Sequence, residues 1–217
     1  MIRVKLLILF ITLSAHKCDN LICDNLNEAL EYPLKVKVLK LNTCNGFNSV
    51  NDLSNISQLK KLVELEISEC PKVISLPAEI SELHDLKILR FYWNGGGIEM
   101  DWKKQLKIIS ELKELEILQL GPYNIIKELP SEIGSLSNLK VLNISKTTTY
   151  SLPKRISDLK KLEELDISMT KISSLPTEIY LLSNLKKLNL AETSIANDSI
   201  YINEIKSKLP NCEIILY

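Results

Sequence analysis

The feature that constrains the fold most is a phrase of spaced leucines that returns along almost the whole chain. Leucine or another apolar residue fills the first, fourth and sixth positions of this L-x-x-L-x-L phrase. The phrase fits at Val36–Leu41, Leu62–Ile67, Leu86–Phe91, Leu115–Leu120, Leu139–Ile144, Leu162–Ile167, Leu185–Leu190 and Leu209–Ile214. Its fourth positions, from Leu39 to Cys212, are 23 to 29 residues apart. A repeat of this length is typical of a solenoid, in which each unit buries its leucines only by stacking on its neighbours.

Each repeat predicts one strand followed by one short helical turn. The L-x-L part places two apolar side chains on the same side of a strand. Leu-Pro steps follow at Leu76-Pro77, Leu129-Pro130, Leu152-Pro153 and Leu175-Pro176. Proline cannot donate to a strand ladder and presets the first turn of a helix. The I-x-x-L spacing that follows each step is helical. We therefore expect an α/β solenoid of about eight repeats, with a parallel β-sheet on the concave face and short helical turns on the convex face.

The two ends of the chain depart from the repeat. Residues 1–15 have Arg3 and Lys5, an apolar run and then small residues, which is the order of a secretory signal peptide. The alternative is a buried first strand or helix. Residues 16–35 are expected to form an N-terminal cap, with a short helix that begins near Asp24. Residues 36–217 then form the repeat domain, with a C-terminal cap at about 196–217 that contains a helix after Asp198 and a last strand.

Five cysteines, an odd number, exclude complete pairing within one chain. Cys18 and Cys23 either form a disulfide bond that fastens the N-terminal end of an exported protein or remain thiols. Cys44 and Cys70 fall one repeat apart, near the distance that a disulfide bond requires. For this second pair we expect buried thiols rather than a bond.

The overall composition weighs against several classes of function. Lys+Arg and Asp+Glu both number 27, which disfavours a nucleic-acid binder because such domains usually carry a basic excess. The two histidines and the absence of a Cys-x-x-Cys motif disfavour a zinc site. His16 falls next to the predicted signal peptide and His84 is expected at the surface, so no Ser-His-Asp or Cys-His set is evident. We expect a non-catalytic protein with no cofactor and no metal.

The stretch "LEELDISMTKISSLPTEI", residues 162–179, resembles leucine-rich repeats of the Leu-Pro type, which occur in bacterial repeat proteins, animal scaffold proteins and plant resistance proteins. The resemblance covers about Val36 to the C-terminus and implies a binding scaffold. In that family an Asn or Cys after each strand bonds the backbone of the turn. The corresponding position here holds Cys44, Cys70, Asn94, Tyr123 or Asn124, Thr147, Thr170 and Thr193. Threonine hydroxyls can make equivalent bonds.

The third to fifth repeats carry the predicted binding surface. Residues that alternate with the strand leucines are expected on the concave face, and there Ile88, Ile117 and Val141 form an apolar strip. The polar and aromatic members of the same surface are Arg90, Tyr92, Trp93, Gln119 and Asn143. Exposed aromatic residues and arginine are enriched in binding hot spots. Trp102 follows the Gly95–Gly97 insertion. The two tryptophans contribute to binding or pack the insertion onto the body, and the two roles are compatible because a packed loop can still form an edge of the site.

These observations predict an exported module that binds a protein partner of unknown identity on its concave surface. Its final location would be the periplasm, the cell surface or the medium. The predicted mature chain has no membrane span and no nucleic-acid partner. Two alternatives stay open, namely a binder of carbohydrate or another cell-envelope ligand and a structural envelope protein that associates with itself. A monomer is expected, although the apolar last strand offers an edge for a dimer.

Overall fold

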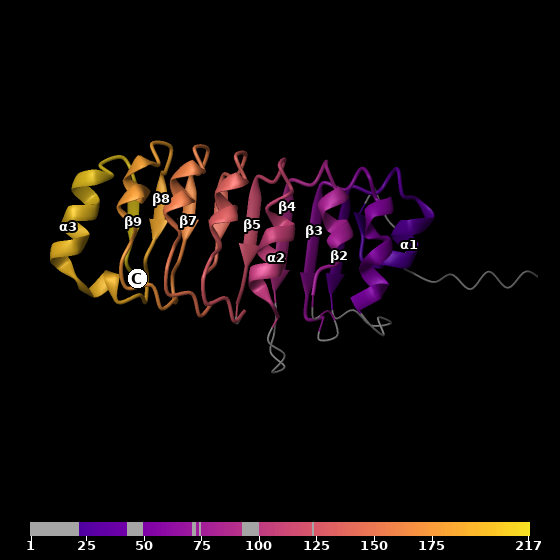
Figure 1. Ribbon diagram of the computed structural model, residues 1–217, viewed down its shortest axis with the longest axis horizontal. Coiled ribbons are helices and arrows are strands. Elements are labelled where there is room, and N and C mark those ends of the chain that lie inside the picture. The colour runs from indigo at the N-terminus through magenta and orange to yellow at the C-terminus, as the bar shows by residue number, and fades with distance from the viewer. Residues whose placement is uncertain (1–21, 43–49, 71–72, 74, 93–99, 123) are drawn as a thin grey trace, which may run out of the picture.

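The computed structural model describes residues 22–42, 50–70, 73, 75–92, 100–122 and 124–217. Within this part of the chain, nine parallel strands form one sheet in the order of the sequence (Figure 1). They are β1 (Ile22–Cys23), β2 (Val38–Asn42), β3 (Glu64–Ser68), β4 (Ile88–Tyr92), β5 (Ile117–Leu120), β6 (Val141–Asn143), β7 (Glu164–Asp166), β8 (Lys187–Asn189) and β9 (Glu213–Ile215). The expected α/β solenoid is confirmed, because consecutive strands neighbour each other along the whole stack.

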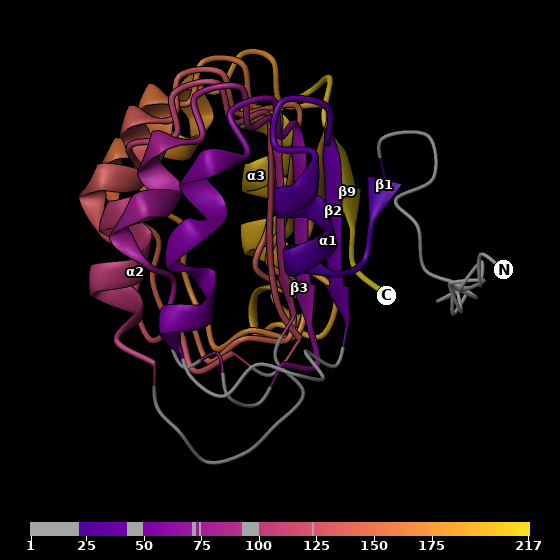
Figure 2. The same ribbon diagram turned by 90° about the vertical axis from the view of Figure 1, so that its right-hand side faces the viewer.

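Helix α2 (Trp102–Ile109) and the 3₁₀-helices run back along one face of this sheet, and α1 (Leu26–Glu31) and α3 (Ser199–Lys208) lie at the two ends of the stack (Figure 1). The 3₁₀-helices are η1 (Val50–Gln58), η2 (Ala78–Glu82), η3 (Ser131–Ser135), η4 (Lys154–Asp158), η5 (Thr177–Leu181) and η6 (Ile195–Asn197). Figure 2 looks along the stack and shows α2 and the 3₁₀-helices on one side and the strands on the other, with α1 and α3 between the two sides. We call the strand face that points away from the helices the open face; it is the face expected to be concave.

The core is a column of the predicted leucines. Leu39, Leu65, Leu89, Leu118, Leu142, Leu165 and Leu188 are register partners from β2 to β8. All seven are buried. The last repeat differs from the prediction, because Leu188 pairs with Ile214 and not with Cys212. The ten-residue helix α3 displaces the last strand by two positions relative to the expected phrase.

The Leu-Pro steps begin the expected helical turns. Proline is the residue before each of η2, η3, η4 and η5. The isoleucine in each of these turns, Ile80, Ile133, Ile156 and Ile179, is fully buried. Each turn therefore packs one apolar side chain against the strand leucines, as the I-x-x-L spacing predicts.

Side chains after the strands satisfy the backbone of the turns. The hydroxyls of Thr147, Thr170 and Thr193 each donate to the carbonyl three residues earlier, at 2.6 to 2.7 Å. Asn124 is buried, and its side-chain amide donates to the Phe91 carbonyl at 3.3 Å. Asn124 therefore occupies the turn position that the sequence left open between Tyr123 and Asn124. Cys44, Asn94 and Tyr123 lie outside the described residues.

Helices cover both ends of the stack. Asn25, and not Asp24, caps α1 by accepting hydrogen bonds from the backbone N–H groups of Asn27 and Glu28. Asp198 caps α3 as expected, by accepting from Ile200 and Tyr201. These caps satisfy N–H groups that the first turn of a helix leaves without a backbone partner.

Both cysteines that the structure describes in the N-terminal half are oxidised. Cys23 and Cys70 are each disulfide-bonded, which corrects the expectation of a buried thiol at Cys70. Their predicted partners, Cys18 and Cys44, lie outside the described residues, as does the predicted signal peptide. Cys212 is a free thiol, and burial followed by the nearby Glu213 carboxylate raises its pKa to about 11. Among the described helices, none has the length and apolar character needed to cross a membrane.

Candidate binding surface

The open face of β4–β6 holds seven of the predicted site residues. Side chains alternate between the two faces of a strand, so Arg90 points away from its buried neighbours Leu89 and Phe91. The residues in register on β5 and β6 share that face. We call the set Ile88, Arg90, Tyr92, Ile117, Gln119, Val141 and Asn143 the central surface. Each of them is half-buried, so each presents some area to solvent while the sheet holds its base.

Hydrogen bonds fix the polar part of the central surface. Arg90 Nη1 lies 2.5 Å from Glu64 Oε1, and Arg90 Nε donates to Gln119 Oε1 at 2.8 Å. The Tyr92 hydroxyl donates to the same Gln119 oxygen at 2.9 Å. Lys40 Nζ, at 3.6 Å from Glu64 Oε1, extends the network to β2. One connected network therefore crosses β2–β5 and holds the guanidinium and the phenol in fixed positions.

An apolar strip runs beside this network. Ile88, Ile117 and Val141 are direct register partners on three neighbouring strands. Neighbouring strands lie about 4.8 Å apart, so the strip extends about 10 Å across the sheet. The ordered arginine and tyrosine beside this half-buried strip are of residue types that are enriched in protein-binding hot spots.

A small hollow of about 150 Å³ lies at one edge of the central surface. Tyr92, Gln119 and Asn143 line it together with the turn after β5. Gly121 in that turn has φ +151°, and a Cβ there would meet the Ser145 carbonyl oxygen at 2.5 Å. Glycine therefore lets the β5 turn approach the next repeat closely. Partial burial raises the pKa of Tyr92, which keeps its phenol protonated as a donor at neutral pH.

Asn143 has a structural task as well as a place in the central surface. Its Oδ1 accepts from the Ser145 backbone N–H at 2.9 Å. Asp166 and Asn189, at the same position in the next repeats, accept from Ser168 and Ala191 in the same way. These side chains shape the end of their own strand, so only part of their polar capacity faces a partner.

Trp102 does not belong to the central surface. It lies on α2, is 5% exposed and contacts the Phe91 ring edge-on, with 5.5 Å between ring centroids. Phe91 points to the opposite side of β4 from Arg90 and Tyr92. Trp102 therefore packs against the body of the solenoid, away from the central surface, and its contribution to binding stays a prediction. Trp93 lies outside the described residues.

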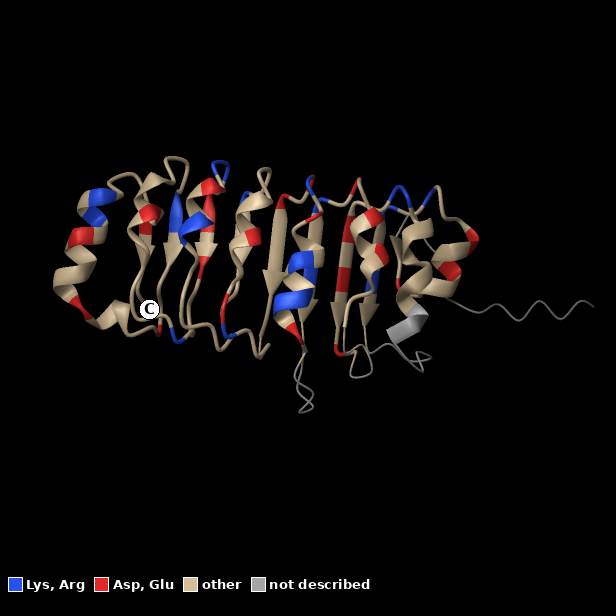
Figure 3. Ribbon diagram, viewed as in Figure 1, with Lys and Arg blue, Asp and Glu red and all other residues tan. Residues whose placement is uncertain are grey.

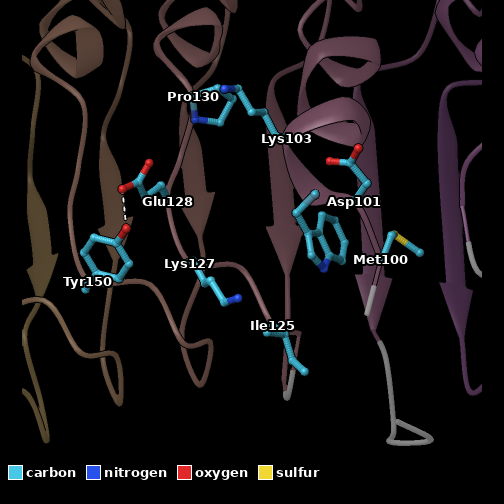
Figure 4. A pocket seen from close by; sticks show the side chains of 9 residues that line it. Met100, Asp101, Lys103, Ile125, Lys127, Glu128, Pro130 and Tyr150 are labelled. Atoms are coloured by element: carbon cyan, nitrogen blue, oxygen red, sulfur yellow. Dashed lines mark hydrogen bonds between the residues drawn. The ribbon is translucent and has the colours of Figure 1, made fainter. Parts of the chain in front are cut away.

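A second hollow, of about 480 Å³, lies where α2 meets the following repeat (Figure 4). Residues at the start of α2 and just before it line one side of the hollow, namely Met100, Asp101, Trp102 and Lys103. The next two repeats line the other side with Ile125, Lys127, Glu128, Pro130 and Tyr150. Its carboxylates are engaged, because Glu128 accepts a hydrogen bond from the Tyr150 hydroxyl and Asp101 caps α2. This hollow lies on the helix side of β4 and is separate from the central surface. The repeat pattern did not predict it, since it arises where an α-helix takes the place of a 3₁₀-helix.

Sequence reasoning also missed Glu64. Glu64 lies one strand from Ile88 in the register, and its carboxylate receives both the Arg90 guanidinium and the Lys40 ammonium. Aligning the repeats placed Glu64 on the correct face. The pairing of Glu64 with Arg90 could have been predicted from the sequence, because an arginine side chain is long enough to reach a diagonal neighbour on the next strand.

Comparisons with known proteins agree with this architecture. A family model described as "Leucine-rich repeat region" matches residues 131–207. The TMV resistance protein N of Nicotiana glutinosa is 31% identical over 139 residues, which is 53% of this chain and 12% of that protein. The chain therefore spans only a small part of this relative.

Two solved structures share the fold. One is the plant peptide hormone receptor RGFR1 in complex with RGF2, with a TM-score of 0.57, 25% identity, and coverage of 84% of this chain and 28% of that chain. The other is an internalin from Listeria monocytogenes, with a TM-score of 0.57, 20% identity, and coverage of 92% of this chain and 58% of that chain.

Proposed function

We propose that this chain, whose residues 131–207 match a leucine-rich-repeat family model, binds a protein or peptide partner on the open face, with the central surface as the anchor. The observation that carries this proposal is the network in which Gln119 accepts hydrogen bonds from both Arg90 and Tyr92 beside the strip that starts at Ile88. The solved peptide hormone receptor with a similar fold supports the class of partner.

The physical advantage of this arrangement is that the surface is ordered before a partner arrives. Association normally costs side-chain entropy, about 0.5–1.5 kcal/mol for each side chain that becomes immobile. Arg90 and Glu64 are 23% and 18% exposed at their side chains, and each is already held by hydrogen bonds or ion pairs. A partner that packs on Ile88, Ile117 and Val141 would gain apolar burial without ordering these groups again.

Much of the hydrogen-bonding capacity of the central surface is already used within the network, so only part of it is available to a partner. The Gln119 oxygen is shared by two donors, and the Glu64 carboxylate by two cations. We therefore expect the apolar strip and the Tyr92 ring to supply most of the binding energy. The hydrogen-bonded groups would fix the shape of the surface and the orientation of the partner.

A paired retention experiment tests the proposal. The first bait is the wild-type chain, and the second carries Arg90→Ala, Tyr92→Ala and Gln119→Ala, which remove the network as a unit. A third bait carries Arg155→Ala on η4, where Arg155 forms an exposed ion pair with Asp158 on the helix side. Circular dichroism and thermal unfolding establish that all three baits are folded.

We expect one protein to be retained by the wild type and by Arg155→Ala but not by the triple variant. Loss of a hot spot costs about 2 kcal/mol or more, which weakens binding about thirtyfold. Equal retention by all three baits would exclude the central surface as the anchor. If no protein is retained by any bait but a glycan array gives a specific signal, the carbohydrate alternative replaces the proposal.

We also propose that the protein acts outside the cytoplasm. Disulfide-bonded Cys23 and Cys70 are typical of an oxidising compartment. The charged and apolar start of the chain, Arg3 to Ala15, supports the same location. To test this, the full chain is expressed and the exported product is analysed by mass spectrometry. A protein that stays inside the cell with residues 1–15 still attached would contradict the proposal.

A further inference from the structure

The charges on the open face differ on the two sides of the apolar strip. On the β2–β4 side, Lys40 and Arg90 compensate Glu64 and Glu66, so the sum of charges is zero. On the β7–β9 side, three carboxylates, Glu164, Asp166 and Glu213, face a single cation, Lys187. Figure 3 shows both signs of charge along the stack. The excess of two negative charges is therefore confined to the side of the face that follows the strip.

One of these carboxylates lies directly beside the strip, and a second lies on the same strand beside Asn143. Glu164 is the register partner of Val141, so about 4.8 Å separates their strands. Glu164 is exposed and forms no ion pair with any described residue. Asp166 lies two residues further along β7 and faces the same way. Its Oδ1 accepts from the Ser168 backbone and hydroxyl at 2.9 and 2.7 Å, and its Oδ2 accepts from the Asn143 side-chain amide at 3.4 Å, which fixes the carboxylate in place.

An apolar strip with carboxylates beside it can bind a partner segment that has one apolar and one basic side chain. Building on the proposed function, we infer that the partner is a peptide segment in which a Lys or Arg lies about three positions from an apolar anchor. The apolar side chain packs on Ile117 and Val141, and the cation pairs with Glu164 and Asp166. A carboxylate has about four lone-pair sites, and the bonds from Ser168 and Asn143 leave one of them, on Oδ2 of Asp166, for a cation.

The geometry also sets the spacing within the partner. The distance across the sheet from β5 to β7 is two strand spacings, or about 10 Å. A segment that crosses the strands in an extended conformation advances about 3.3 Å per residue. The basic residue is therefore about three positions from the residue that packs on Ile117. Because the other flank of the strip is neutral, this charge also specifies which way the segment lies across the sheet.

Selection from a phage-displayed library of random linear peptides tests the inference. The wild-type chain is the bait, and the affinities of the enriched peptides are then measured by fluorescence anisotropy. The test variant carries Glu164→Gln and Asp166→Asn, and the new asparagine keeps the oxygen that accepts from Ser168. A control variant carries Asp158→Asn and Glu178→Gln, which make the same change in net charge on the helix side. A third variant, Tyr92→Ala, reports on the central surface itself.

The inference predicts peptides with Lys or Arg about three residues from an aliphatic or aromatic residue. Their affinity should fall at least about fivefold in the test variant, stay unchanged in the control variant, and fall with added salt. Peptides that need Tyr92 but bind the test variant as tightly as the wild type would overturn the inference and leave the proposed function standing. Two results would overturn both the inference and the proposed function. One is the absence of enriched peptides, and the other is peptides whose affinity changes neither in the test variant nor in Tyr92→Ala.

Discussion

The hydroxyl of Thr170 shows how a single side chain holds a turn of the solenoid. It is buried and donates to the Ile167 carbonyl at 2.7 Å, in the position that the resemblance assigns to Asn or Cys. Thr170→Val keeps the shape but removes the donor. We expect unfolding free energy to fall by about 1–2 kcal/mol in urea titrations. Thr177→Val, at an exposed position in η5, is the control. Equal effects of the two changes would show that the buried hydrogen bond has no special role.

Met169 occupies a backbone conformation that side chains disfavour. Its φ is 54°, and Glu69, Lys146 and Glu192 have similar values at the same place in other repeats. Such a conformation costs a non-glycine residue about 1 kcal/mol or more. Because Met169 is 40% exposed, Met169→Gly loses little packing and should raise the unfolding free energy by up to about 1 kcal/mol. Met169→Ile should lower it, and the opposite ranking in urea unfolding would contradict this account of the turn.

The two α-helices within the repeats each supply a partner for a Leu-Pro step. Gln105 of α2 is buried and accepts from the Leu76 backbone N–H at 2.7 Å. The Tyr201 hydroxyl of α3 accepts from the Leu175 N–H at 2.9 Å. Gln105→Leu and Tyr201→Phe each leave a backbone donor without its acceptor. We expect each to lower the unfolding free energy by about 1–3 kcal/mol.

Exposed Lys104 on α2 offers a matched control for Gln105. Lys104→Leu should change the unfolding free energy much less than Gln105→Leu, when both are measured by chemical denaturation. A Gln105→Leu protein as stable as the wild type would mean that the Leu76 N–H finds another acceptor.

Strand positions could be predicted from the sequence wherever leucine spacing alone determines them. The register from Leu39 to Leu188 follows directly from the phrase, because only that alignment buries every leucine. The last strand could not be placed this way. Cys212 is apolar and fits the phrase, yet Ile214 pairs with Leu188, because α3 takes up more chain than a 3₁₀-helix does.

The candidate surface was predictable as a face but not as a set of contacts. Alternation along β4 places Ile88 and Arg90 on the open face without a structure. Trp102 could not be assigned, since an insertion breaks the repeat and only packing on Phe91 decides its direction. Hydrogen bonds across strands, such as the one from Arg90 to Gln119, depend on side-chain conformations that spacing does not report.

Over the length of the stack, ion pairs between repeats add a pH-dependent contribution to stability. Glu116 lies between Lys140 and Lys87, at 2.6 and 2.9 Å. Hydrogen bonds from these lysines lower its pKa from 4.5 to about 2. The unfolded chain therefore binds a proton at a higher pH than the folded chain does. The stabilisation is complete above about pH 4.5 and is lost as the pH falls towards 2.

Thermal unfolding at several pH values checks this assignment. Glu116→Gln should lower the melting temperature at pH 7, and its difference from the wild type should shrink between about pH 4.5 and 2. Glu114→Gln, at an exposed position that forms no ion pair with a described residue, is the control. A Glu116→Gln difference that does not change with pH would contradict the role of the ion pairs.

The central claim is that a protein partner binds the open face, and site-specific photocrosslinking tests it most directly. A photoreactive phenylalanine analogue replaces Val141 on the open face in one protein and exposed Lys154 on η4 in another. After illumination with a source-cell extract, adducts are identified by mass spectrometry. The account predicts an adduct with one defined protein from position 141 and none with that protein from position 154. If a defined protein is crosslinked from position 154 and none is crosslinked from position 141, binding lies on the helix side and the account is contradicted.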